Sequence, residues 1–201
     1  MITPDFFEQV PALRLRDPLA ALLGAAAGGI LEYRYLDAVK WAGHSCPTVA
    51  GAWLMTRAAL RHLYGDAMAE RGGIQVELRD PQATGTAGVV GGVIGLIVGA
   101  AGEGGFKGLA GGHSRRDLLL FGVEMPAEVR FTRLDDGAAV SLDYNPAVVP
   151  PDPAMPALMQ RLLAGAANPD ERVEFGRLWQ DRVRRILLEH GDDPDLVKIR
   201  S

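Results

Sequence analysis

The residues whose types and spacing suggest chemistry lie in one short stretch, Gly43-His44-Ser45-Cys46-Pro47-Thr48. It contains the only cysteine of the 201-residue chain and one of its four histidines. In an extended His-x-Cys segment, side chains two residues apart lie on the same side, so His44 and Cys46 can converge on one point. Because an imidazole nitrogen and a thiolate sulfur can both bind a metal ion, these two residues are candidate metal ligands.

The element that must position this pair is a helix predicted over residues 47–64. Proline suits the first helical position, so Cys46 would lie at the N-terminus of this helix. The amide dipoles there favour the thiolate, which is both a metal ligand and a nucleophile. One helical face carries the apolar residues Val49, Trp53, Leu60 and Leu63. The alternative is a buried, unreactive cysteine beside a capping or core histidine.

Catalytic zinc sites hold the ion with three protein ligands and leave one position open. His44 and Cys46 would therefore need a third protein ligand. We expect His113 to be the third, since the glycine-rich loop that carries it can approach the turn. A solvated loop histidine is the alternative for His113. His62 lies about four turns along the helix from Cys46 and is too far away. His190 lies at a predicted helix C-terminus, where a cation suits the dipole.

A second group of polar residues surrounds the loop Gly102-Glu103-Gly104-Gly105-Phe106-Lys107-Gly108. We expect Lys107 and Arg115 to bind a carboxylate or phosphate of a small ligand, and Glu103 to act as a base or an oxygen ligand. The stretch lacks the residue order of a P-loop or of a dinucleotide-binding loop. A solvated, basic surface is the alternative interpretation.

The composition excludes several classes of protein. With 48% hydrophobic residues the chain can bury a substantial core. A net charge of −4 without a basic stripe argues against nucleic-acid binding. One cysteine excludes an intrachain disulfide framework and a four-cysteine zinc ribbon, and an unpartnered thiol fits a reducing compartment. The N-terminal residues do not resemble a signal peptide, so we expect a cytoplasmic protein.

Residues 81–102 contain no charged side chain, and residues 87–101 are all Ala, Gly, Val, Ile or Leu. The fully apolar part has about 15 residues, whereas a membrane span needs about 20. Flanking aromatic and basic residues are also missing. We therefore expect a buried, glycine-rich helix and no membrane association.

Helical and alternating patterns occur without a regular βα order, which predicts an α+β fold with an antiparallel or mixed sheet packed against helices. Asp135-Asp136-Gly137 predicts a hairpin turn between two strands. Prolines at 150, 151, 153 and 156 predict a linker. We expect a core over residues 1–150 and a C-terminal helical segment over residues 151–201. Asn168-Pro169-Asp170-Glu171 starts a long helix there, whose apolar stripe packs on the core or on a partner.

The block from Tyr35 to Leu63, with Gly43-His44-Ser45-Cys46-Pro47 at its centre and Gly51 beyond it, resembles the FmdE-like proteins, a family named after formylmethanofuran dehydrogenase. The weaker second half and the C-terminal helix around Trp179 also resemble that family. The resemblance implies an α+β core, frequent dimerisation and a transition metal, usually zinc, at the His-x-Cys turn. Members often carry further cysteines after the first long helix, and this chain has none there.

The sequence leads us to expect a metal-binding protein in which His44 and Cys46 hold zinc or a similar ion, with a position open for a small ligand or substrate. Such an ion can polarise a carbonyl or activate water. One alternative is a cysteine-nucleophile enzyme using Cys46 with His44 or His113 as base. Another is a non-catalytic, homodimeric ligand-binding module. The sequence leaves open whether the protein is an enzyme.

Overall fold

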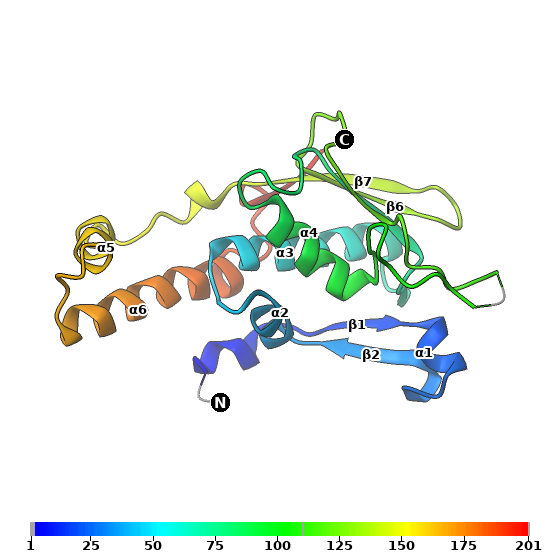
Figure 1. The fold of residues 1–201 in the computed structure, drawn as a ribbon, viewed down its shortest axis with the longest axis horizontal. Helices are drawn as coiled ribbons and strands as arrows, with labels where there is room; N and C mark the ends of the chain where they lie inside the picture. The colour runs from blue at the N-terminus through cyan, green and yellow to red at the C-terminus, as the bar shows by residue number, and fades with distance from the viewer. Residues whose placement is uncertain (1–2, 110, 201) are drawn as a thin grey trace.

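A computed structural model describes residues 3–109 and 111–200. The described residues form six α-helices and eight β-strands in two mixed sheets, and they confirm the predicted α+β class (Figure 1). The helices are α1 (Pro18–Leu22), α2 (Tyr35–Ala42), α3 (Pro47–Tyr64), α4 (Ala87–Val98), α5 (Met155–Leu163) and α6 (Pro169–Arg184). A π-helical turn, Arg185–Glu189, continues α6, so the long C-terminal helix is also confirmed. Short 3₁₀ turns cover Asp5–Gln9, Ala27–Gly29 and Pro146–Val148.

The smaller sheet has the strand order β2-β1-β3 and the larger one the order β5-β4-β6-β7-β8. The strands of the smaller sheet are β1 (Leu13–Arg16), β2 (Ile30–Tyr33) and β3 (Ala69–Glu70). Those of the larger sheet are β4 (Ile74–Leu78), β5 (Leu119–Phe121), β6 (Val129–Arg133), β7 (Ala139–Tyr144) and β8 (Val197–Arg200). Only the pairs β1–β3 and β4–β5 are parallel. The β6–β7 pair is antiparallel around the Asp135–Gly137 turn, which confirms the predicted hairpin.

Helices α3 and α4 lie between the two sheets and form the middle layer of the core (Figure 1). Eleven residues of α3 are buried, including the predicted face of Val49, Trp53, Leu60 and Leu63. The glycine-rich stretch forms α4, which is largely buried as predicted. Within the described ranges, no helix has the length and apolar character needed to cross a membrane.

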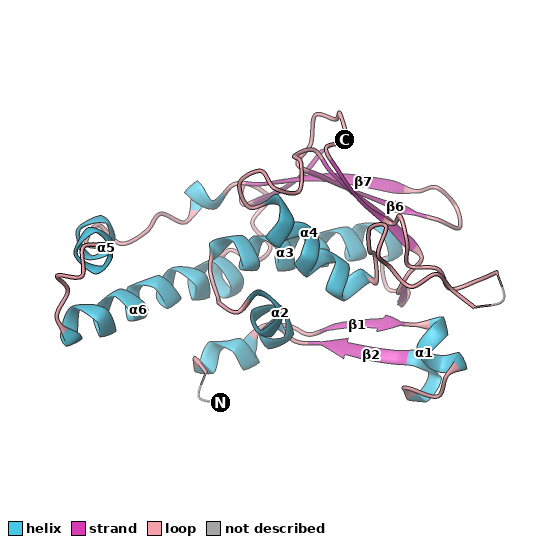
Figure 2. Cartoon of the chain, in the orientation of Figure 1, coloured by secondary structure: helices cyan, strands magenta, loops and turns pink. Residues whose placement is uncertain are grey.

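Three details differ from the sequence-based expectation. Asp17-Pro18 predicts the start of a helix that runs to about Ala26. Helix α1 instead ends at Leu22, because Gly24 adopts a positive φ and no residue of α1 is buried to hold it. The sequence patterns do not predict the short strands β1, β3 and β8. Pro150, Pro151 and Pro153 lie in a loop, as expected, but Pro156 belongs to the first turn of α5, and a short helical turn precedes the loop (Figure 2).

A buried ion network joins the smaller sheet to α4. Asp17, at the start of α1, accepts hydrogen bonds from Arg71 Nη1 and Arg115 Nη2, both at 2.8 Å. Arg71 also donates to the carbonyls of Leu96 and Ile97 at the C-terminus of α4, where a cation suits the helix dipole. Burial opposes ionisation of Asp17, but hydrogen bonds from Arg71 and Ala20 and the charge of Arg115 lower its pKa below 3.8.

Gly72 makes this network possible. Its φ of +83° is a conformation that other residues adopt only with strain, and a Cβ there would lie 0.9 Å from Arg115 Nη1. The guanidinium of Arg115 therefore occupies space that only a glycine leaves open. The Arg115 side chain is 9% exposed, and its Nη1 also donates a hydrogen bond to the Arg71 carbonyl.

We predict that Asp17→Asn keeps the cap of α1 but leaves two arginines without their carboxylate. The free energy of unfolding at pH 7 should fall by about 3 kcal/mol. Because the Asp17 pKa is depressed in the folded state, its stabilisation is complete above pH 3.8 and is lost as the pH falls through the folded-state pKa. Urea unfolding of both proteins from pH 7 to pH 3 measures this.

The matched control is Glu174→Gln, which removes a surface ion pair to Arg177. It should leave the free energy of unfolding nearly unchanged, because exposed ion pairs contribute little to stability. Equal losses in the two variants would contradict a structural role for the Asp17 network.

Candidate functional site

The His-x-Cys turn lies where α3 begins. Cys46 is the N-cap residue, with φ −150° and ψ 170°, and Pro47 is the first helical residue as predicted. The thiol is a free cysteine, 7% exposed, and makes no capping hydrogen bond. His44 is exposed. The turn thus places an accessible imidazole two residues before a thiol that lies just beneath the surface.

The imidazole of His44 is oriented by the backbone two residues earlier in the chain. Its Nδ1 lies 3.0 Å from the carbonyl oxygen of Ala42. A carbonyl can only accept, so Nδ1 carries the proton in this hydrogen bond. In the neutral ring, Nε2 then keeps its lone pair, which is the arrangement that backbone carbonyls impose on metal-binding histidines.

Ser45, between the two candidate ligands, is held by three side chains. Its hydroxyl lies 3.0 Å from Tyr35 Oη in the core. Its carbonyl accepts from Trp179 Nε1 at 2.9 Å and from Gln180 Nε2 at 3.1 Å. Helix α6 is therefore fixed to the turn by two hydrogen bonds, and the turn is fixed to the core by a third.

Tyr144 of β7 holds the next residue, because its hydroxyl donates to the Pro47 carbonyl at 2.9 Å. Burial raises the pKa values of both Tyr35 and Tyr144 above the ordinary value. Both phenols are therefore protonated at neutral pH and act as hydrogen-bonding groups rather than bases.

Two buried polar atoms among the described residues have no hydrogen-bond partner, Trp53 Nε1 and Gln180 Oε1. Such atoms are rare in folded proteins and mark strain or a position for water or a ligand. Gln180 Oε1 belongs to the side chain that donates to Ser45, so an acceptor without a donor lies beside the His-x-Cys turn.

The structure brings only part of the predicted site together. Across residues 3–109 and 111–200, no three His, Cys, Asp or Glu side chains form a group that could hold a metal, so His113 does not complete such a group with His44 and Cys46. His113 lies in a loop with φ +61°. Lys107 and Glu103 are exposed in the glycine-rich loop. Arg115, expected to bind a ligand, is instead buried against Asp17.

Four residues beside the turn belong to the site without any sign of it in the sequence: Tyr35, Tyr144, Trp179 and Gln180. Tyr35 is fully buried in the core. The others lie 97, 134 and 135 positions from their partners in the turn. No local pattern could have indicated those contacts.

A mostly apolar cavity of about 240 Å³ borders the turn. It lies where α5 and α6 approach the start of α3. Its walls are Pro47, Pro151, Met155, Pro156, Met159, Leu178, Trp179 and Arg182. Pro47 belongs to the turn itself, so the cavity and the candidate metal ligands share one wall.

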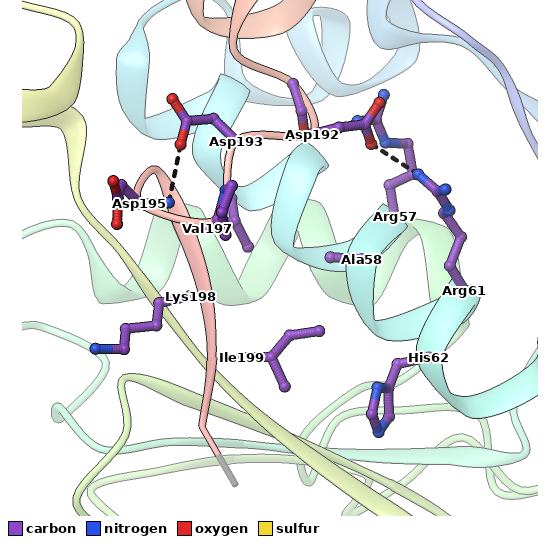
Figure 3. Close-up of a pocket in the computed structure, with 12 residues that line it drawn as sticks. Arg57, Ala58, Arg61, His62, Asp192, Asp193, Asp195, Val197, Lys198 and Ile199 are labelled. Carbon is purple, nitrogen blue, oxygen red and sulfur yellow. Dashed lines mark hydrogen bonds and ion pairs between the residues drawn. The ribbon is translucent and has the colours of Figure 1, made fainter.

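A larger cleft of about 600 Å³ lies between α3 and the C-terminal strand (Figure 3). Its two arginines, Arg57 and Arg61, both bind Asp192, at 2.9 and 2.7 Å. Asp193 binds His190, which is not part of the cleft wall. Lys198 points away from the α3 side chains (Figure 3). Both arginines of this cleft therefore already have a carboxylate partner.

Comparison with known proteins identified no relative of this chain: no family model, curated protein or solved structure matches it. The resemblance to the FmdE-like family stays a prediction.

The position of Tyr144 over the start of α3 depends on Gly51. A Cβ on Gly51 would lie 2.4 Å from the Tyr144 ring. We predict that Gly51→Ala displaces this ring, weakens its bond to Pro47 and lowers the free energy of unfolding by about 1–3 kcal/mol. Chemical unfolding followed by circular dichroism measures the change.

The matched control is Gly176→Ala in α6, where a Cβ would meet nothing within 4 Å. It should stabilise the helix by about 0.5–1 kcal/mol. If Gly51→Ala also stabilised the protein, the close contact with Tyr144 would not constrain the turn.

Proposed function

We propose that the chain binds a divalent transition metal, with zinc the best fit, through His44 and Cys46. The observation that carries the proposal is the hydrogen bond between His44 Nδ1 and the Ala42 carbonyl. It leaves Nε2 available two residues from a thiol that makes no capping bond. A soft sulfur and an imidazole nitrogen suit zinc. The His-x-Cys-Pro resemblance to FmdE-like proteins supports the same chemistry.

Two residues fill half of a tetrahedral sphere, so the remaining ligands come from elsewhere. Within the described residues, no carboxylate, histidine or further cysteine joins His44 and Cys46 as a third ligand. Water, a small-molecule ligand or a side chain of a second copy would complete the sphere. The unpaired Gln180 Oε1 beside the turn supports a bound water or ligand, because it can accept a hydrogen bond from either.

When bound, such an ion polarises a carbonyl or lowers the pKa of a water. The chain's own residues orient the site. Ala42 fixes the tautomer of His44, and Trp179 and Gln180 hold the backbone of Ser45. Tyr144 holds the first turn of α3 behind Cys46. This rigid turn keeps the two ligands in place before the metal arrives.

Elemental analysis of protein purified without an affinity tag tests metal binding. We predict zinc in the wild type, and a metal affinity at least about tenfold lower in Cys46→Ala and in His44→Ala, since each loses one of two protein ligands. His62→Ala is the control, because His62 is exposed on α3 about four turns away. Equal metal content in all four proteins would refute the proposal.

In that event the second candidate function is a thiol nucleophile, which the position of Cys46 at the N-terminus of an 18-residue helix favours. Rapid labelling of Cys46 by iodoacetamide at pH 7 in metal-free, folded protein would then support it. Labelling no faster than that of the unfolded chain would exclude it.

We also propose that the protein is a homodimer. The last turns of the C-terminal helix pack on the chain's own core, where Ile186 is fully buried. Helix α5 and the first part of α6 instead project away from both sheets (Figure 1). On this projection Leu163 is 81% and Val173 72% exposed. Exposed apolar side chains on a projecting helical pair are typical of a protein interface.

We predict that Val173→Glu shifts the protein from dimer to monomer, because a carboxylate in an apolar interface loses its hydration. Light scattering across a concentration series measures the mass. Leu22→Glu is the control, since Leu22 is 63% exposed at the opposite end of the molecule and should leave the mass unchanged. A monomeric wild type would contradict the proposed interface.

A further inference from the structure

The cavity beside the turn contains an arginine that, unlike the two arginines of the larger cleft, has no carboxylate partner. Arg182 is half-buried in its wall, and no carboxylate among the described residues lies within ion-pairing distance of it. Nε and Nη2 donate to the carbonyls of Val149 and Pro146, at 2.7 and 2.9 Å. Burial lowers the pKa of Arg182, which reflects the cost of holding this cation out of water.

We propose that this cavity binds a small carboxylic acid with an apolar body, such as one aromatic ring on a short chain. The carboxylate would pair with Arg182, and the apolar body would fill the space between α5 and α6. The proposal names the ligand class of the proposed metal site and rests on it only for the idea that the ligand reaches the metal.

The walls of the cavity determine the apolar part of the ligand. Met155, Met159 and Leu178 supply flexible, apolar surface, and Trp179 supplies an aromatic ring. An apolar cavity of roughly 150 Å³ holds benzene. A volume of about 240 Å³ therefore accommodates one ring with a short substituent, and is too small for a nucleotide.

The guanidinium of Arg182 determines the polar part of the ligand. A cation removed from water without a counter-ion is costly, and an anion at hydrogen-bonding distance recovers that cost. Arg182 Nη1 makes no hydrogen bond within residues 3–109 and 111–200. The two N–H groups of Nη1 therefore remain available, and a carboxylate is the anion that these donors and an apolar cavity of this size suit best.

The cavity also lies next to the proposed metal ligands. Pro47, which follows Cys46, forms one wall, and Trp179 forms another while its Nε1 donates to Ser45. A ligand seated against Trp179 would change the surroundings of this indole N–H. That group is therefore a direct reporter of binding.

The test is an NMR titration of the full chain with phenylacetate and with phenylacetamide, a neutral molecule of the same shape. The chain has three tryptophans, so Trp179→Phe assigns the indole signal of Trp179. We expect phenylacetate to shift that signal and to bind at least about tenfold more tightly than the amide. Equal affinity for the two, or no shift with phenylacetate, would overturn the proposal.

Arg182→Met should abolish the preference for the acid, whereas Arg172→Met should leave it unchanged, because Arg172 is exposed on the same helix. If Arg182→Met lowers the unfolding temperature, Met159→Trp provides a second variant. It fills the cavity, keeps Arg182 and should lower the affinity for both ligands. A retained acid preference in Arg182→Met, or unchanged binding in Met159→Trp, would refute the site.

Repeating the titration in Cys46→Ala and in the presence of a chelator separates this inference from the proposed function. Phenylacetate binding that survives both treatments supports the cavity whether or not the metal analysis succeeds. If the metal-replete wild type shows no preference for phenylacetate over phenylacetamide, the cavity proposal is refuted and the metal-binding proposal is unaffected.

Discussion

The burial of α3 is the constraint on which the rest of the structure depends. This helix packs against α4, α2, β7, β8 and the π-helical turn after α6, and 11 of its 18 residues are buried. A helix enclosed on so many sides cannot rotate or slide without disrupting the core. Its first residue follows Cys46, so the position of the only thiol is set by core packing rather than by a loop.

Local signals predicted the elements whose ends are set by a few neighbouring residues. Pro47 and Gly65 delimit α3, Asn168 caps α6 by bonding the Glu171 amide, and the turn at residues 135–137 joins β6 to β7. Strands β1 and β8 have only four residues each, and each depends on distant partners. Their short alternation of apolar and basic residues carries little weight without those partners.

The candidate site divides in the same way. His44 and Cys46 were predictable because their chemistry and spacing are contained in three residues. The role of Arg115 was not, because the sequence reveals a charge but not the carboxylate of Asp17, which lies 98 positions away. An arginine in a glycine-rich loop resembles a ligand-binding residue until its partner is known. Here the glycine at position 72 admits the guanidinium to the interior, so the same side chain becomes structural.

The distribution of satisfied and unsatisfied polar groups distinguishes the surroundings of Asp17 from those of Cys46. Around Asp17, the carboxylate accepts from two arginines and from backbone amides of α1, as expected of a purely structural cluster. Around Cys46, Gln180 Oε1 has no donor and Arg182 has no carboxylate within the described residues. A buried acceptor without a donor, such as Gln180 Oε1, is rare in folded proteins. Since Gln180 and Arg182 both lie on α6, the helix held to the Ser45 carbonyl, the imbalance favours ligand chemistry at the start of α3 over the glycine-rich loop.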